Sequence, residues 1–204
     1  MRSCLACQTA LVRQERFVCI DCLEGLEHTG FHLHPQDNEM YKRIAGKVPL
    51  EGAYSMTWFD KGGAIQNILQ SLKYSRQPEI GVWLGAQYGR ALALSGTTFL
   101  PDTCLVPVPL HWRKQRKRGY NQAEKICEGL AGKLNLPVRT DLLKRVKYTK
   151  TQTRMSGHRR YNNVSQAFEC SQSISAPILL VDDVMTTGAT LESCIKSLKD
   201  SALD

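Results

Sequence analysis

The sequence of 204 residues lacks any long apolar segment. No run approaches the roughly 18 consecutive apolar residues that a membrane-spanning helix needs, and the first seven residues, MRSCLAC, contain no apolar signal core. These absences predict a cytoplasmic protein without membrane insertion. Two phosphate-binding motifs, GxxxxGK[ST] and GxGxxG, are also missing. Their absence excludes a P-loop nucleotide site and a Rossmann-type dinucleotide site.

The chain is basic, with a formal net charge of +8. An excess of this size favours anionic partners, which include phosphorylated metabolites and nucleic acids. The length accommodates one α/β domain and a small appendage. We expect three parts: a cysteine module over residues 1–25, a solvated linker over 26–50 and an α/β domain over 51–204.

The cysteines fall into two groups. Cys4, Cys7, Cys19 and Cys22 form two C-x2-C pairs with eleven residues between them. In a reducing compartment this spacing predicts a tetrahedral Cys4 site for structural Zn²⁺. The alternatives are a pair of disulfides, which requires secretion, and a redox C-x2-C, which lacks its usual βαβ context. The remaining cysteines are isolated, and we expect them to be small buried side chains: Cys104, Cys127, Cys170 and Cys194.

Residues 178–190 contain the main candidate site. Four apolar residues, Ile178 to Val181, predict a strand buried on both faces. The strand ends at Asp182 and Asp183, a run of small residues follows, and apolar residues then recur at helical spacing up to Leu198. A helix N-terminus after such a turn binds anions, and carboxylates accept hydroxyls or a hydrated Mg²⁺. The alternative is a plain strand–turn–helix with an acidic strand end.

Other segments give a coarse outline of the fold. A run of β-formers at 53–59 predicts a strand, and apolar periodicity predicts helices at about 63–74, 79–95 and 122–134. Glycines in the second helix indicate close packing, and Asn121 is a suitable N-cap for the third. Strands are expected from Cys104 to about Val106 and around 142–146. The basic tract 113–118 is a solvated loop, a nucleic-acid patch or a polyphosphate clamp, and 147–163 has the composition of a long mobile loop.

The stretch 178–190 resembles the PRPP loop of type I phosphoribosyltransferases. The Val-Pro-Val-Pro-Leu run at 106–110, the segment Arg118-Gly119-Tyr120-Asn121-Gln122 and the tripeptide Leu72-Lys73-Tyr74 narrow the resemblance. Together with the cysteine module and the segment 159–168, they are similar to the ComF family of competence-associated proteins over essentially the whole chain. The resemblance implies a type I phosphoribosyltransferase fold, a parallel-sheet core with flanking helices, plus the Cys4 zinc module. Family members usually continue into one more strand, so the chain is expected to be truncated at Asp204.

The resemblance also implies roles for individual residues. Asp182 and Asp183 would serve catalysis by accepting the ribose hydroxyls of PRPP and helping to place Mg²⁺. The 5-phosphate would lie on the turn formed by Val184, Met185, Thr186, Thr187, Gly188, Ala189 and Thr190. The pyrophosphate side or the flexible loop would be formed by Pro107, Val108, Pro109, Arg118, Gln152 and Arg159.

Two functions follow from these expectations. The first is transfer of phosphoribosyl from PRPP, or a related phosphosugar, to an unidentified acceptor with release of pyrophosphate. The second is a non-catalytic platform for single-stranded DNA or DNA-uptake proteins that retains the PRPP-loop fold. The basic tract favours the platform through phosphate contacts, although only Trp112 and Tyr120 flank it as aromatics.

Overall fold

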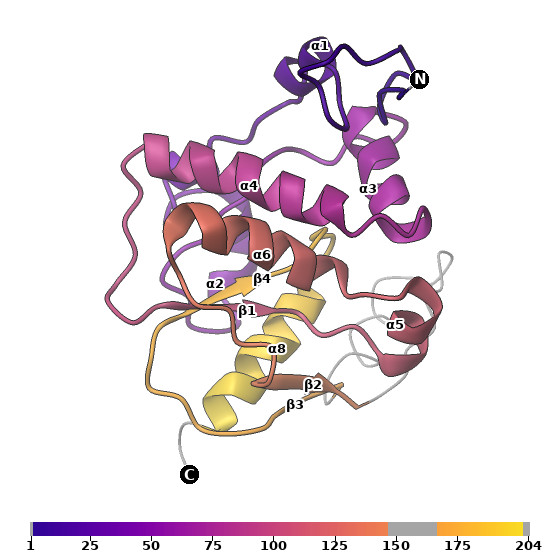
Figure 1. The fold of residues 1–204 in the computed structure, drawn as a ribbon. Coiled ribbons are helices and arrows are strands. Elements are labelled where there is room, and N and C mark those ends of the chain that lie inside the picture. Colours follow the sequence, from indigo (N-terminus) through magenta and orange to yellow (C-terminus); the bar gives the residue numbers. More distant parts are fainter. Residues whose placement is uncertain (1, 147–166, 202–204) are drawn as a thin grey trace.

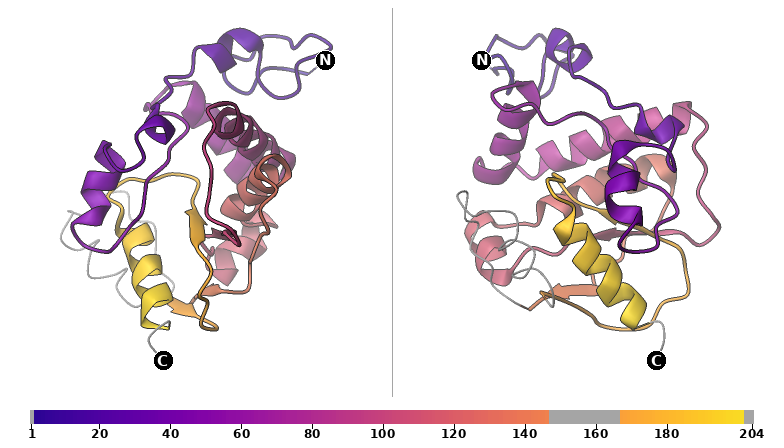
Figure 2. Two further views of the ribbon diagram at one scale, coloured as in Figure 1. Left: turned by 90° about the vertical axis from the view of Figure 1, so that its left-hand side faces the viewer. Right: turned by 180° about the vertical axis from the view of Figure 1, so that it is seen from behind.

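The computed structural model describes residues 2–146 and 167–201 (Figure 1). Its centre is a parallel pair of strands, β1 (Cys104–Pro107) and β4 (Ile178–Val181). Helix α8 (Ala189–Asp200) lies on one face of the pair, and helices α4 (Glu79–Leu94) and α6 (Gln122–Leu134) lie on the other (Figures 1 and 2). This layered arrangement confirms a parallel sheet with flanking helices.

The register of the parallel pair places the carboxyl ends of both strands together. Cys104 pairs with Ile178 and Pro107 with Val181. An isolated parallel bridge joins Leu105 to Val138 on the other side of β1. A second pair, β2 (Leu143–Arg145) and β3 (Phe168–Cys170), is antiparallel. Loops that follow β1 and β4 therefore emerge at one edge of the sheet.

The expectation that β4 is buried on both faces was wrong for most of the strand. Only Val181 is buried, and Ile178, Leu179 and Leu180 are half-buried. The reason is an apolar cavity of about 780 Å³, which these residues line. Asp182 and Asp183 also line this cavity.

Helices α4 and α6 pack with their backbones almost in contact. A Cβ atom added to Gly85 would lie 2.0 Å from the carbonyl oxygen of Ile126, and one added to Gly129 would lie 2.0 Å from that of Val82. No side chain fits at either position. The expectation that the glycines of the second helix permit close packing is confirmed.

Periodic apolar segments formed helices with the expected bounds. The helices expected at 63–74, 79–95 and 122–134 are α3 (Ala64–Tyr74), α4 and α6. The Asn121 side chain accepts a hydrogen bond from the Ala123 N–H, as an N-cap does. Of the isolated cysteines, Cys104, Cys127 and Cys194 are buried, whereas Cys170 is only half-buried.

Two local expectations were wrong. Residues 53–59 form no strand but only a bridge between Thr57 and His28, because the neighbouring segment offers a single point of pairing. The basic tract is a helix, α5 (Trp112–Arg118), and not a loop. The His111 side chain caps its start by accepting the N–H of Arg113, and Gly119, at φ +90°, ends it.

Residues 26–50 are more than a solvated linker. They contain a 3-10 turn, η1 (Phe31–Leu33), and helix α2 (Glu39–Ala45), whose N-cap Asn38 accepts the N–H of Tyr41. Ile44 and Val48 are buried in the same apolar cluster as Val106 of β1 and Leu191 of α8. Among residues 2–146 and 167–201, no helix has both the length and the apolar character to cross a membrane.

Candidate functional site

The acidic pair lies where the two parallel strands end. Asp182 and Asp183 follow β4 directly, and the N–H of Val108 donates to the carbonyl of Val181 at 2.8 Å. The turn Pro107–Val108–Pro109 therefore runs beside the carboxylates, and the Asn121 side chain holds it by donating to the Val108 carbonyl at 3.0 Å. The structure thus brings together two segments that the resemblance implied to be parts of one site.

The two carboxylates have different surroundings. Burial and the neighbouring Asp183 charge raise the pKa of Asp182 to about 7. Asp182 also accepts the backbone N–H of Asp183 at 2.8 Å. Asp183 pairs instead with Lys73, whose Nζ lies 2.7 Å from its Oδ2. Such a pair of carboxyls with divergent environments is typical of functional sites.

A group of cations lies close to the acidic pair. Lys114 of α5 has a lowered pKa because of burial and because Arg145, Arg118 and Lys73 lie near it. Burial lowers the pKa of Arg145 of β2, and the nearby Asp182 charge opposes this shift. Arg118 donates to the Gln122 side chain at 2.7 Å and lies 5.8 Å from the centre of the Tyr74 ring. Anionic groups of a ligand would therefore meet several positive charges beside two carboxylates.

The turn Val184–Gly188 leads into α8, a helix of twelve residues whose first two are Ala189 and Thr190. Gly188 adopts φ +81° as the N-cap, a conformation that favours glycine. The Ala189 N–H donates to Thr187 Oγ1 at 3.4 Å. N–H groups and the helix dipole are thus directed at the space in front of the turn, the arrangement that binds phosphate.

Helix α2 braces this turn, a contact that sequence reasoning missed. Arg43 donates from Nη1 to the carbonyl of Thr186 at 3.0 Å. A Cβ on Gly188 would lie 3.3 Å from Cγ1 of Ile44. The N-cap Asn38 and the apolar pair Met40 and Ile44 could have indicated the helix, but nothing local indicates where it docks. Gln152 and Arg159, which the sequence predicted for the same site, lie outside the described residues.

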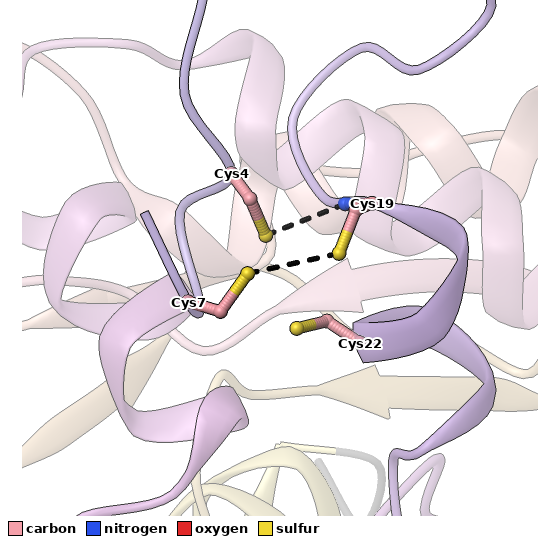
Figure 3. Close-up of side chains that lie close together, drawn as sticks. All are labelled: Cys4, Cys7, Cys19 and Cys22. Atoms are coloured by element: carbon pink, nitrogen blue, oxygen red, sulfur yellow. Dashed lines mark hydrogen bonds between the residues drawn. The ribbon is translucent and has the colours of Figure 1, made fainter. Parts of the chain in front are cut away.

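The four paired cysteines converge in the N-terminal module. Their Sγ atoms all lie within 4.8 Å of one another, and those of Cys7 and Cys19 are 3.8 Å apart (Figure 3). Tetrahedral zinc with sulfur ligands at about 2.3 Å requires S···S separations of about 3.8 Å. Cys4 Sγ accepts the N–H groups of Ala6 and Cys19, and hydrogen bonds with Thr9 lower the pKa of Cys7 to about 6. Both effects favour the thiolate form of Cys4 and Cys7, whereas burial and the neighbouring sulfur atoms raise the pKa of Cys22. The convergence of the four sulfur atoms is what fits a metal ion such as Zn²⁺.

The alternative of a pair of disulfides is not observed, since all eight cysteines are free thiols.

The cysteine module packs directly on helix α3. Val18 and Leu26 share an apolar cluster with Ile65 and Ile68, and the Asn67 side chain donates to the carbonyl of Ala6 at 3.0 Å.

Similarity to known proteins bears out the resemblance to the ComF family. The chain is 39% identical over 104 residues to Competence protein F of Haemophilus influenzae, a match that covers 49% of this chain and 45% of that protein. It is 30% identical over 193 residues to DNA utilization protein YhgH of Escherichia coli K12, covering 92% of this chain and 80% of the relative. The chain belongs to the ComF family.

YhgH of Salmonella typhi is a further relative, 31% identical to this ComF-family chain over 128 residues, which are 61% of this chain and 56% of that protein. The chain thus aligns with a little under half of Competence protein F and with most of Escherichia coli YhgH. No family model matches the chain.

Proposed function

We propose that this ComF-family protein binds PRPP, or a closely related phosphosugar, and transfers its phosphoribosyl group to an acceptor with release of pyrophosphate. The observation that carries the proposal is the acidic pair at the carboxyl ends of β1 and β4, directly before a turn into the N-terminus of α8. Ligands of open α/β sheets bind at this edge. The adjacent cations, Lys73, Lys114, Arg118 and Arg145, suit a second phosphate-bearing end.

In the proposed reaction the bond between the anomeric carbon and the pyrophosphate oxygen breaks, and its electron pair leaves with pyrophosphate. A lone pair of the acceptor forms the new bond to that carbon. Positive charge develops on the sugar as in glycoside cleavage, and Asp182 and Asp183 stabilise it while accepting the ribose hydroxyls. The cations neutralise charge on the leaving group. A Mg²⁺ ion, which Asp182 and Asp183 would help to hold, would supply further positive charge there. Gly188 to Thr190 hold the 5-phosphate.

The test is binding followed by turnover. PRPP with Mg²⁺ raises the melting temperature of the zinc-loaded protein, and the double variant Asp182→Asn, Asp183→Asn abolishes that shift. Measurement of pyrophosphate release during a screen of bases, ammonia and other amines then separates catalysis from binding alone. Absence of a thermal shift at millimolar PRPP refutes the proposed ligand.

A second function is supported by the surface of α5, on which the protein would bind single-stranded DNA as a non-catalytic platform. Trp112 and Tyr74 are both exposed, and arginines lie against their rings, with Arg113 at 5.1 Å and Arg118 at 5.8 Å from the ring centres. Basic and aromatic groups together are what single-stranded nucleic acids bind. The relatives named for competence and DNA utilization support a link to DNA uptake. Contacts with other DNA-uptake proteins are part of this proposal.

The platform is tested by the salt dependence of binding. An oligonucleotide that binds this surface dissociates steeply as salt rises, because each neutralised phosphate releases counterions. Replacing Arg113, Arg116 and Lys117 with Gln makes the oligonucleotide affinity fall less steeply with salt concentration. Trp112→Ala weakens binding but leaves this salt dependence unchanged. If neither change affects oligonucleotide binding, α5 is not the contact surface.

We also propose that the cysteine module holds structural Zn²⁺. Four protein thiolates close a tetrahedral site, so the ion stabilises the fold and offers no open position for catalysis. One bound zinc ion per chain by elemental analysis, lost in the Cys4→Ser variant, is the expected result.

A further inference from the structure

Lys73 differs from the other cations near the proposed pyrophosphate end because it is already paired with one of the two carboxylates. It lies in the last turn of α3, far in sequence from the acidic pair, yet its Nζ is 2.7 Å from Asp183 Oδ2. Its side chain is 23% exposed and that of Asp183 is 17% exposed. A sugar hydroxyl that approaches this carboxylate oxygen therefore meets an ammonium group already bound to it.

The helix end that carries Lys73 is firmly held. The preceding residue, Leu72, is buried, and its carbonyl accepts the buried hydroxyl of Tyr120 at 2.6 Å. The following residue, Tyr74, lies under the guanidinium of Arg118. In contrast, a lysine ammonium is carried on a flexible stem of four carbons. The backbone is thus fixed while the charge can move by a few ångströms.

The charges around that ammonium limit where it can go. It pairs directly with Asp183, and Asp182 is the neighbouring carboxyl. Lys114 of α5 is a cation near it, and Arg145 and Arg118 lie near Lys114 in turn. When a ligand takes the carboxylate oxygen, the ammonium loses its counter-ion while the like charges remain. An anionic group of the ligand, placed between the acidic pair and α5, is then the available partner, and hydrogen bonds between charged groups are the strong ones.

We propose that Lys73 is an exchangeable counter-ion: it holds Asp183 in the unliganded protein and moves to a pyrophosphate oxygen when the phosphosugar binds. This inference rests on the proposed function. It assigns a role to the central residue of the tripeptide Leu72–Lys73–Tyr74. It also makes Lys73 a determinant of specificity, because a sugar phosphate without pyrophosphate displaces the ammonium and provides no new partner for it.

The test compares two ligands by calorimetry in zinc-loaded protein with Mg²⁺. In Lys73→Met, PRPP binds at least about tenfold more weakly, as expected for loss of a charged hydrogen bond. Ribose 5-phosphate binds equally well or more tightly, because Asp183 no longer has a competing partner. Lys73→Arg restores most of the PRPP affinity. Lys125→Met is the matched control, since Lys125 is also 23% exposed and pairs with a carboxylate, Glu128, away from the site.

The outcomes distinguish failure of the inference about Lys73 from failure of the proposed function. Equal weakening of both ligands in Lys73→Met shows a merely structural ion pair and overturns the inference, as does unchanged PRPP binding. If ribose 5-phosphate binds neither protein measurably, a PRPP loss in Lys73→Met with recovery in Lys73→Arg sustains it. If the wild-type protein binds no PRPP, the proposed function fails and the inference fails with it.

Discussion

The substitution Asp182→Asn is expected to stabilise the protein above neutral pH. Burial and Asp183 raise the pKa of this carboxyl from 3.8 to about 7 in the folded state. A raised folded-state pKa contributes stability that is complete below the unfolded pKa and is lost as pH rises through the folded value. Above pH 7 the folded protein therefore holds a second charge beside Asp183 that the unfolded chain would solvate freely.

The size of the effect follows from the linkage between protons and folding. From pH 5 to pH 8 the unfolded carboxyl is already ionised, while the folded one stays protonated until about pH 7. At about 1.4 kcal/mol for each pH unit, the free energy of unfolding falls by about 2–3 kcal/mol over this range. An asparagine cannot ionise, so the variant escapes this loss. We therefore expect the stability of the variant relative to wild type to rise by about 2–3 kcal/mol between pH 5 and pH 8.

Urea unfolding followed by tryptophan fluorescence measures this difference, with both proteins zinc-loaded at each pH. The matched control is Asp141→Asn. Hydrogen bonds from Arg139 lower the pKa of Asp141 to about 2, so this carboxyl is ionised in both states from pH 5 to 8 and its removal introduces no pH dependence. A difference between wild type and Asp182→Asn that stays flat with pH, or a less stable variant at pH 8, would refute the reasoning.

Three other predictions concern the framework around the site. Cys4→Ser lowers the melting temperature by roughly 10 °C through loss of the metal, whereas Cys170→Ser, at an isolated half-buried thiol, leaves it nearly unchanged in the same scan. Gly85→Ala destabilises the fold by about 2–3 kcal/mol in urea because its methyl group meets the Ile126 carbonyl, while Gly132→Ala, with open space around it, stabilises α6 by about 0.5–1 kcal/mol. Tyr120→Phe removes the hydrogen bond to Leu72 and reduces the free energy of unfolding by about 1 kcal/mol.

Local patterns predicted those parts of the fold that local forces determine. The periodic apolar residues of α3, α4 and α6, and the Asn121 cap, depend on neighbours within one or two turns, so their sequence carries the information. The run 53–59 has strand-forming residues, but a strand also needs a partner ladder, and the chain supplies only one bridge. The basic tract 113–118 has no apolar periodicity to indicate a helix, and the caps of α5, His111 and Gly119, lie outside the tract.

The site was predictable to the extent that strand ends define it. The resemblance implied that Asp182 and the turn at Pro107–Pro109 belong to one site, and the shared edge of the parallel strands β1 and β4 explains why they meet. Lys73 and Arg43 could not be assigned from sequence, since each reaches the site from a helix that docks there through tertiary packing. The role of the predicted residues Gln152 and Arg159 stays a prediction.

The apolar core shared by the cysteine module and α3 determines which truncated fragments of the protein can be used in experiments. A fragment that begins at residue 51 would keep every residue of the acidic edge. It would also uncover Ile65 and Ile68 on α3 and lose Ile44 and Arg43 from behind the turn at Gly188. Such a fragment would tend to aggregate through the exposed apolar face of α3. If it failed to bind a ligand, the removal of residues 1–50 would explain the failure, and the result would not apply to the intact chain.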